Sequence, residues 1–461
     1  MNFVLYDITF LILFTLGIVI FLYKRRHNLK REGLLYLYKT SFGIKLLERA
    51  TKKYRKILKP LQYVIVTSGY ILLGVMLWLL VKFTWFYLAS PSAAKALKVP
   101  VVMPLIPYLP NLFNISYLPP FYFTYWIIII AIIAIPHEFS HGLFARLNKI
   151  KILSTGFGFL GPFLAAFVEQ DDKQMKKAKI FPQLSVLAAG TFANVIMTVL
   201  FGLIFWLFFV TAFTPAGVNF NTYSISAVNI SSISGISFVT LDNATNYTLA
   251  QVSAGNKTYF ATQSMLDSLN ETNATQVILY DDSPALKSKL VGAVYEINGI
   301  KITNPQQLNA SLSSFNPGDN VTIATITSDK QTRTYNITLS ETNGRAFLGI
   351  GLLSYESSGV MGKFYSLIAK IKDPFIYYES RIGDIGIFID NLLWWIVLVN
   401  LSVALMNMLP AGMFDGGRFF YLTILAITKK KSIAEKAFKV STWILLGILA
   451  LLIIKWALVI F

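Results

Sequence analysis

The fold of this chain is decided by residues 135–142, which read IPHEFSHG and lie inside a long apolar segment. They contain the pattern H-E-x-x-H. Four residues make slightly more than one helical turn, so His137 and His141 project from one helix face, where two imidazoles can hold zinc while Glu138 acts as a general base. Ionisable side chains inside a lipid-spanning segment are costly to bury and by default mark function. The pattern therefore predicts the chemistry of a metalloprotease.

The composition is that of a polytopic membrane protein. Of 461 residues, 55% are hydrophobic, 15% are aromatic and only 14% are charged, which is too apolar for a soluble globular protein. The formal net charge of +18 comes from Lys and Arg beside apolar segments, as the positive-inside rule requires, and this placement argues against nucleic-acid binding. The chain has no cysteine, so disulfides and thiolate ligands are excluded and a metal must be held by nitrogen and oxygen.

Apolar segments and their basic flanks predict about six membrane crossings, with both ends of the chain outside the cytosol. The expected spans are residues 3–23, 61–90, 121–147, 183–213, 385–408 and 440–460. The basic tract 24–59 is expected in the cytosol, as helices on the inner leaflet or as a solvated loop. The proline-rich stretch 91–120 is expected to be an external loop, because its prolines interrupt regular helix.

The third ligand is expected to be a carboxylate at the same depth in the membrane as the two histidines. His141 lies about 10 Å from the cytosolic end of its span. The fifth span ends in residues 407–418, NMLPAGMFDGGR, where the proline should end the helix and the glycines permit a turn that returns Asp415 to the membrane. Catalytic zinc usually takes three protein ligands and one water. Asp415 is the favoured third ligand, with Asp390 and Glu169 as rival carboxylates.

Two further segments belong near this site. Residues 156–168 are apolar but too short and too interrupted by glycine and proline to span, which predicts a re-entrant or interfacial hairpin, with a plain cytosolic loop as the alternative. Residues 190–194 read GTFAN. A glycine and Asn194 four residues apart on one helix face indicate either close helix packing or a hydrogen-bonding group directed at a central site.

A soluble domain is expected from residue 214 to about residue 359, where hydroxyl side chains and Asn replace the apolar runs. N-x-S/T sequons lie at Asn229, Asn243, Asn246, Asn256, Asn270, Asn273, Asn309, Asn320 and Asn336. Their density agrees with an extracytosolic face. Together with the absence of cysteine, it favours a surface protein of an archaeon.

Taken together, these segments resemble the site-2 protease family of intramembrane zinc metalloproteases, particularly prokaryotic members with an extracytosolic PDZ domain. The matching pieces are HEFSH at 137–141, AFVE at 166–169, the element 190–194, and N-x-x-P-x-x-x-x-D-G at 407–416. Thr191 departs from the family, which often has proline there.

The resemblance implies a polytopic α-helical membrane fold with about six transmembrane helices and an inserted β-rich, PDZ-like domain. It implies Zn²⁺ held by His137, His141 and Asp415, with Glu138 as the catalytic base. It also assigns Asn194 and Asn407 to the substrate backbone or to the oxyanion.

The expected domains are residues 1–120 (anchor helices and a basic cytosolic segment), 121–213 (first half of the catalytic membrane core), 214–359 (extracytosolic domain) and 360–461 (second half of the core and C-terminal helix). Within the third, residues 282–302, DSPALKSKLVGAVYEINGIKI, look like a PDZ segment with a turn at Asn298-Gly299. The PDZ-like part is expected at about 275–352. Residues 214–275 match no known pattern and are expected to be an insertion or an additional β-element.

The predicted function is regulated intramembrane proteolysis: cleavage of the transmembrane segments of single-span proteins in the plasma membrane, at a site near the cytosolic side. A helical substrate must unwind, and the hairpin at 156–168 is expected to receive it by strand addition. The extracytosolic domain is expected to filter substrates by size or to dock a peptide ligand. Two other classes stay open, namely a proton-coupled transporter using His, Glu and Asp as a relay and a proteolytically inactive scaffold that binds partners.

Overall fold

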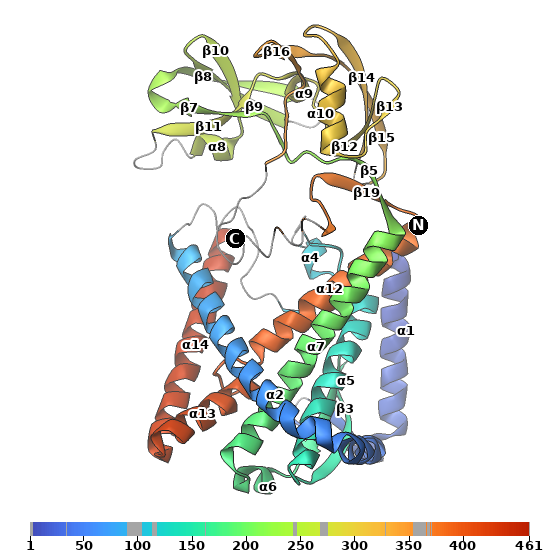
Figure 1. The fold of residues 1–461 in the computed structure, drawn as a ribbon, viewed down its shortest axis with the longest axis vertical. Coiled ribbons are helices and arrows are strands. Elements are labelled where there is room, and N and C mark those ends of the chain that lie inside the picture. The colour runs from blue at the N-terminus through green and yellow to red at the C-terminus, as the bar shows by residue number, and fades with distance from the viewer. Residues whose placement is uncertain are drawn as a thin grey trace. The chain divides into compact units, whose positions relative to one another are not determined.

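The computed structural model describes residues 3–33, 35–89, 104–112, 118–161, 163–242, 247–267, 275–327, 329–353, 366, 369 and 371–460 (Figure 1). It divides into two compact units. The membrane unit comprises Met1–Leu207 and Phe388–Phe461, and the β-rich unit comprises Phe208–Ile387. Most of the predicted external loop at 91–120, and the sequons at Asn243, Asn246, Asn270 and Asn273, lie outside the described residues.

Among the described residues, six helices are long and apolar enough to cross a membrane, as the sequence predicts. They are α1 (Phe3–Lys24), α2 (Phe42–Ala89), α5 (Phe123–Leu147), α7 (Ile180–Ala212), α12 (Asp384–Met406) and α14 (Lys431–Ile460). Shorter helices of the membrane unit are α4 (Leu109–Leu112), α6 (Asp172–Lys177) and α13 (Asp415–Thr428). The long apolar runs form helices because helical backbone satisfies its own hydrogen bonds in lipid.

The basic tract after α1 differs from the expectation of leaflet helices or a solvated loop. Its first part forms the strands β1 (Leu29–Glu32) and β2 (Leu35–Thr40), and its second part runs without a break into the span as α2, which is 48 residues long. The physical reason lies in Tyr36, Tyr38 and Thr40 of β2, which suit a strand, and in the pairing with β3, where Tyr38 lies opposite Phe157.

The predicted hairpin is present, in place of the alternative plain loop. It consists of β3 (Ile152–Leu160) and β4 (Phe163–Gln170), which pair antiparallel. The turn contains Gly161 at φ +58°, a backbone conformation that glycine adopts without strain. With β1 and β2 these strands form a four-stranded sheet in the order β1-β2-β3-β4, so β4 is an edge strand.

The core of the membrane unit packs α2, α5, α7 and α13 together with the sheet. Gly142 marks a close approach, because a Cβ atom there would lie 2.9 Å from side-chain atoms of both Leu47 on α2 and Val168 on β4. Helix α5 is thus held between a neighbouring helix and the edge strand.

Helix α1 contributes one buried carboxylate. Asp7, 1% exposed, accepts hydrogen bonds from the backbone N–H groups of Phe123 (2.8 Å) and Thr124 (2.9 Å) and from the Tyr108 hydroxyl (2.5 Å). The residue before α5, Tyr122, makes no side-chain cap of its own. Asp7 therefore caps the first turn of α5 from another helix, where backbone donors and the helix dipole favour an anion.

The β-rich unit contains two larger sheets. One has six strands in the order β15-β14-β12-β5-β19 with β13 beside β12, and the other has five strands in the order β7-β11-β10-β9-β8. The strands are β5 (Phe213–Val218), β6 (Thr222–Tyr223), β7 (Ile225–Asn229), β8 (Ile233–Asp242), β9 (Tyr247–Ala254), β10 (Lys257–Ala261), β11 (Gln276–Asp281), β12 (Ala293–Ile297), β13 (Ile300–Lys301), β14 (Asn320–Ile326), β15 (Thr332–Thr338), β16 (Ser340–Thr342), β17 (Arg345–Phe347), β18 (Ile350–Gly351) and β19 (Ile376–Ser380). The helices are α8 (Gln263–Asp267), α9 (Pro284–Lys287) and α10 (Pro305–Ser313).

The boundaries of this unit differ from those expected. Strand β19, beyond residue 359, pairs with β5, and β11 joins the five-stranded sheet rather than the segment after residue 282. Within the stretch 214–275, residues 225–261 supply β7 to β10 of that sheet, whereas β5 belongs to the six-stranded sheet. Asn298 and Gly299, at φ +47° and +81°, form the expected turn between β12 and β13. The assignment of the six-stranded part as PDZ-like stays a prediction.

Candidate metal centre

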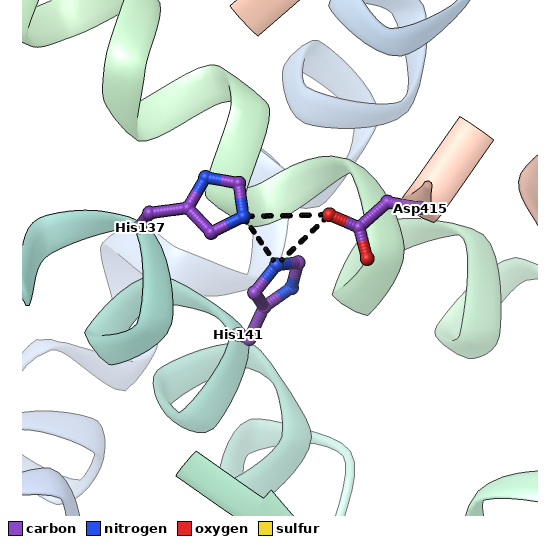
Figure 2. Close-up of side chains that lie close together, drawn as sticks. All are labelled: His137, His141 and Asp415. Carbon is purple, nitrogen blue, oxygen red and sulfur yellow. Dashed lines mark hydrogen bonds and ion pairs between the residues drawn. The ribbon is translucent and has the colours of Figure 1, made fainter. Parts of the chain in front are cut away.

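Three side chains from two helices converge in the membrane unit. His137 and His141 lie on α5, Asp415 is the first residue of α13, and all three point toward one another (Figure 2). The two Nε2 atoms are 3.1 Å apart, and Asp415 Oδ2 lies 3.4 Å from Nε2 of His137 and 3.2 Å from Nε2 of His141. Among the described residues, no other group of three or more His, Asp or Glu gathers its ligand atoms this closely.

These distances fit a zinc ion. Ligand atoms about 2.0–2.1 Å from one tetrahedral zinc lie about 3.3 Å from each other, and the three donor atoms form a triangle of that size. Two imidazole nitrogens and one carboxylate oxygen are also the ligand types of catalytic zinc sites. Both histidines are more than nine-tenths buried, at 7% and 9% exposure, so the arrangement is held by packing.

The second nitrogen of each ring explains why Nε2 faces the cluster. His141 Nδ1 lies 2.7 Å from the backbone carbonyl oxygen of Val186, to which an N–H can donate. His137 Nδ1 lies 3.1 Å from the side-chain amide of Asn194. When both N–H groups donate, each Nε2 keeps a lone pair for a metal.

The amide of Asn194 fits this tautomer in one orientation. Asn194 is fully buried, and its Oδ1 has no partner when Nδ2 faces the ring. The oxygen and nitrogen of an amide are exchanged by a half-turn, so Oδ1 facing His137 Nδ1–H removes the buried unpaired acceptor. We assign this orientation. Asn194 then contacts the His137 ring at Nδ1, the nitrogen that does not face the three converging atoms.

Helix α7 also approaches the ligands directly at Gly190. A Cβ atom there would lie 2.4 Å from His141 Nε2 and 2.7 Å from His137 Nε2. Such contacts are closer than van der Waals distance, so any larger side chain would displace the imidazoles. The element 190–194 therefore serves both predicted purposes, close helix packing and a hydrogen-bonding group at the centre.

Glu138 lies beside the cluster and contacts strand β4. Its carboxylate Oε2 accepts a hydrogen bond from the backbone N–H of Val168, at 3.1 Å, and the side chain is half-buried. Glu138 is not one of the three converging residues, which agrees with a role other than ligand. The contact places the edge strand of the sheet directly next to this carboxylate.

Asp415 is positioned by an irregular turn. Helix α12 ends at Met406, before the proline expected to end it, and the Gly416 N–H donates to the Asn407 carbonyl oxygen at 2.7 Å. A Cβ atom on Gly416 would lie 2.2 Å from backbone atoms of Met408, so the turn requires glycine. Asn407 thus supports the Asp415 turn through its backbone, while its side chain is half-buried.

Neither rival carboxylate joins the cluster. Glu169 accepts hydrogen bonds from Lys39 Nζ, at 2.8 Å, and from the Ser154 hydroxyl, and these partners hold the pKa of its carboxyl below the usual value. Asp390 is buried within α12, away from the converging atoms. Asp415 is therefore the carboxylate that the fold brings to the histidines.

Sequence reasoning missed the Val186 carbonyl, and it offered close packing at Gly190 as one alternative without indicating that the histidine rings are what this glycine approaches. Backbone carbonyls carry no residue-specific signal. The only hint of Gly190 was its place four residues before Asn194.

Comparison with known proteins supports the nature of this site. The model of peptidase family M50 matches residues 125–452, well over half of the 461 residues. The match includes His137, Glu138, His141 and Asp415, and members of this family are in general zinc-dependent intramembrane metalloproteases. No curated protein matches significantly. The chain therefore belongs to peptidase family M50, the family of the site-2 proteases.

Proposed function

We propose that this protein cleaves the transmembrane segments of single-span membrane proteins as a zinc endopeptidase. The observation that carries the proposal is the buried triangle of His137, His141 and Asp415 ligand atoms with Glu138 beside it. A structural pair of histidines needs neither a third converging carboxylate nor a glutamate held at an edge strand.

The roles of the residues follow from their positions. His137 Nε2, His141 Nε2 and Asp415 Oδ2 would hold Zn²⁺. When bound, zinc lowers the pKa of a coordinated water toward neutrality and polarises a peptide carbonyl. The Glu138 carboxylate accepts the proton of the attacking water and then gives it to the leaving amine nitrogen. The Val168 N–H orients this carboxylate.

Strand β4 is the proposed binding site for the unwound substrate segment. Among the described residues, no strand pairs with its outer edge, so its backbone groups other than the Val168 N–H, which donates to Glu138, are available to an extended segment. A helical peptide bond is protected by its own hydrogen bonds, so we expect helix-weakening residues near the cleavage position. Substitution of proline into the hairpin should then abolish cleavage and leave zinc content intact.

The two asparagines divide the roles that the resemblance assigns to both. Asn194 orients His137 from behind, because it is fully buried against Nδ1. Asn407 remains the candidate for contacting the substrate backbone, since its side chain is half-buried and its carbonyl supports the turn beside Asp415.

We further propose a plasma-membrane location with the metal centre toward the cytosol and the β-rich unit outside. The positive-inside rule supports this orientation. The sequon residues that the structure describes, Asn229, Asn256, Asn309, Asn320 and Asn336, are all exposed, so a glycosylating enzyme can reach them. In this orientation the PDZ-like part filters substrates by size or docks a peptide.

Neither competing function gains support. A proton relay in a transporter does not require three ligand atoms at the spacing of one zinc ion. An inactive scaffold does not require a buried ligand set with oriented tautomers.

The test compares wild type, Glu138→Gln and Glu435→Gln, each purified in detergent. Zinc content is measured by elemental mass spectrometry, together with cleavage of a model single-span substrate. Glu138→Gln should keep its zinc and lose at least about a hundredfold in rate, because general-base catalysis contributes that much or more. Glu435, an exposed glutamate on α14, is the matched control and should behave as wild type. Full cleavage by Glu138→Gln, or active enzyme without zinc, would overturn the proposal.

A further inference from the structure

A basic pocket lies between α2 and the end of α5 in the membrane unit. It is a cavity of about 390 Å³. Its walls are formed by Glu48, Thr51, Lys52 and Arg55 of α2 and by Arg146, Leu147 and Lys149 at the end of α5. The α2 residues follow the spacing i, i+3, i+4, i+7, so they form one helix face. Nothing in the proposed proteolysis uses this pocket.

The pocket carries an excess of positive charge. Arg146 is paired with Glu48, the one carboxylate in the lining. Within the part of the chain that the structure describes, no ion pair is found for Lys52, Arg55 or Lys149. Three cations therefore share one cavity, and their mutual repulsion favours the binding of an anion. The carbonyls at the end of α5 carry partial negative charge, which the surplus cations outweigh.

The position of the pocket indicates which kind of anion is available to bind there. It lies where α5, an apolar span, ends and the chain turns through Lys149 at φ +63°. The same part of α2 exposes the apolar side chains of Leu46 (56%) and Ile57 (64%) among its cations, as a helix at the lipid interface does. Basic pockets between spans at the cytosolic face bind phospholipid head groups.

We propose that this pocket binds the phosphate of an anionic phospholipid. Lys52 and Arg55 contact the phosphate from α2, and Arg146 and Lys149 contact it from the end of α5. The lipid thereby ties α2 to the last turn of the helix that carries His141. Binding does not depend on proteolysis, so it can be tested whether or not the enzyme cleaves.

The first experiment uses the full-length protein in detergent with added dioleoylphosphatidylglycerol or dioleoylphosphatidylcholine. Retained lipid is counted by native mass spectrometry, and thermal unfolding gives the stabilisation. The variant Lys52→Ala/Arg55→Ala is compared with Arg49→Ala/Lys53→Ala, which removes the same two residue types from α2 outside the pocket lining. The pocket variant should bind phosphatidylglycerol about thirtyfold more weakly, at about fivefold for each cation. The control should lose less than about fivefold.

A third variant acts in the opposite direction. Glu48→Gln removes the only carboxylate from the lining, so it should bind phosphatidylglycerol severalfold more tightly. It keeps the proposal open to refutation if the double variant fails to fold.

Three outcomes would overturn the proposal. Equal losses in the two double variants would mean diffuse attraction to basic surface. Equal retention of phosphatidylcholine and phosphatidylglycerol would mean that the anion is not recognised. An equal rise in melting temperature with inorganic phosphate alone would reassign the pocket to free phosphate.

Discussion

The two sides of the metal centre are built differently. His137 and His141 come from consecutive turns of a regular helix, so their separation is set by local geometry. Asp415 follows an irregular turn after α12 and is positioned by the backbone bond from Gly416 to Asn407. The histidine pair depends on packing only for the orientation of its rings. Asp415 depends on tertiary structure for its position as well. Substitutions on each side can therefore fail in different ways.

Removal of a ligand should have the largest effect on zinc affinity. This effect should be the same for a histidine on α5 as for Asp415 on α13. His141→Ala and Asp415→Ala each delete one of three donor atoms. Each should weaken zinc binding by more than about a hundredfold, beyond the loss expected for a residue that only supports a ligand. Competition with a chelating dye measures this affinity. His27→Ala, which removes the only histidine outside the cluster, should leave zinc binding unchanged, and a loss there would mean that the ligand set is wrong.

Gly190→Ala tests the packing on the helical side. The added methyl group would lie 2.4 Å from His141 Nε2, so the rings must move or α7 must shift, at about 1–3 kcal/mol of folding free energy. Zinc content and melting temperature should both fall. Gly202→Ala on the same helix meets no atom within 4 Å and should be neutral or slightly stabilising, because alanine favours helix. Similar behaviour of the two variants would refute the packing argument.

Gly416→Ala tests the other side. Its methyl group would lie 2.2 Å from the Met408 backbone, so the turn before α13 must open and carry Asp415 away from the histidines. Zinc affinity should fall by about the tenfold to hundredfold typical of a lost supporting contact. The apolar helices should stay folded, as circular dichroism would report. Gly412→Ala in the same turn has only Phe438 at 3.4 Å, and a comparable loss there would point to general sensitivity of the loop.

Substitutions of Asn194 should have the smallest effect on zinc affinity, because Asn194 contacts His137 through one hydrogen bond. Asn194→Leu should lose roughly tenfold to a hundredfold in zinc affinity. Asn194→Asp presents a carboxylate oxygen to His137 Nδ1–H and should stay nearer wild type. A chelator titration measures the zinc affinity of both variants. If Asn194→Asp were the weaker binder of the two, the assigned orientation of the amide would be wrong.

The sequence predicted those parts of the molecule that depend on local geometry. The six spans follow from apolar length, the histidine pair follows from helical spacing, and the end of α12 follows from Pro410. Asp415 was also predicted, because two helices running in one direction bring their ends to one depth.

Long-range pairing accounts for what the sequence did not predict. Strands β1 and β2 were expected to be helices or loop, since nothing near residues 29–40 indicates that β3, more than a hundred residues later, offers β2 a partner edge. The resemblance assigns Asn194 to the substrate backbone or to the oxyanion, which stays a prediction, and its burial against His137 adds a contact that the sequence did not indicate. The limits of the β-rich unit shifted because β19 returns to pair with β5.

The cap on α5 has a consequence for biosynthesis. Asp7 belongs to α1, whereas the N–H groups from which it accepts hydrogen bonds belong to Phe123 and Thr124, more than a hundred residues later in the chain. Until those residues emerge, the carboxylate in α1 lacks two of its partners, and an ionisable group in that setting is costly to hold in lipid. We therefore expect α1 to settle in the membrane only when α5, the helix that carries His137 and His141, follows it. The cap therefore links α1 to the helix that supplies two of the three converging side chains, whereas Asp415, the third, follows later in the chain.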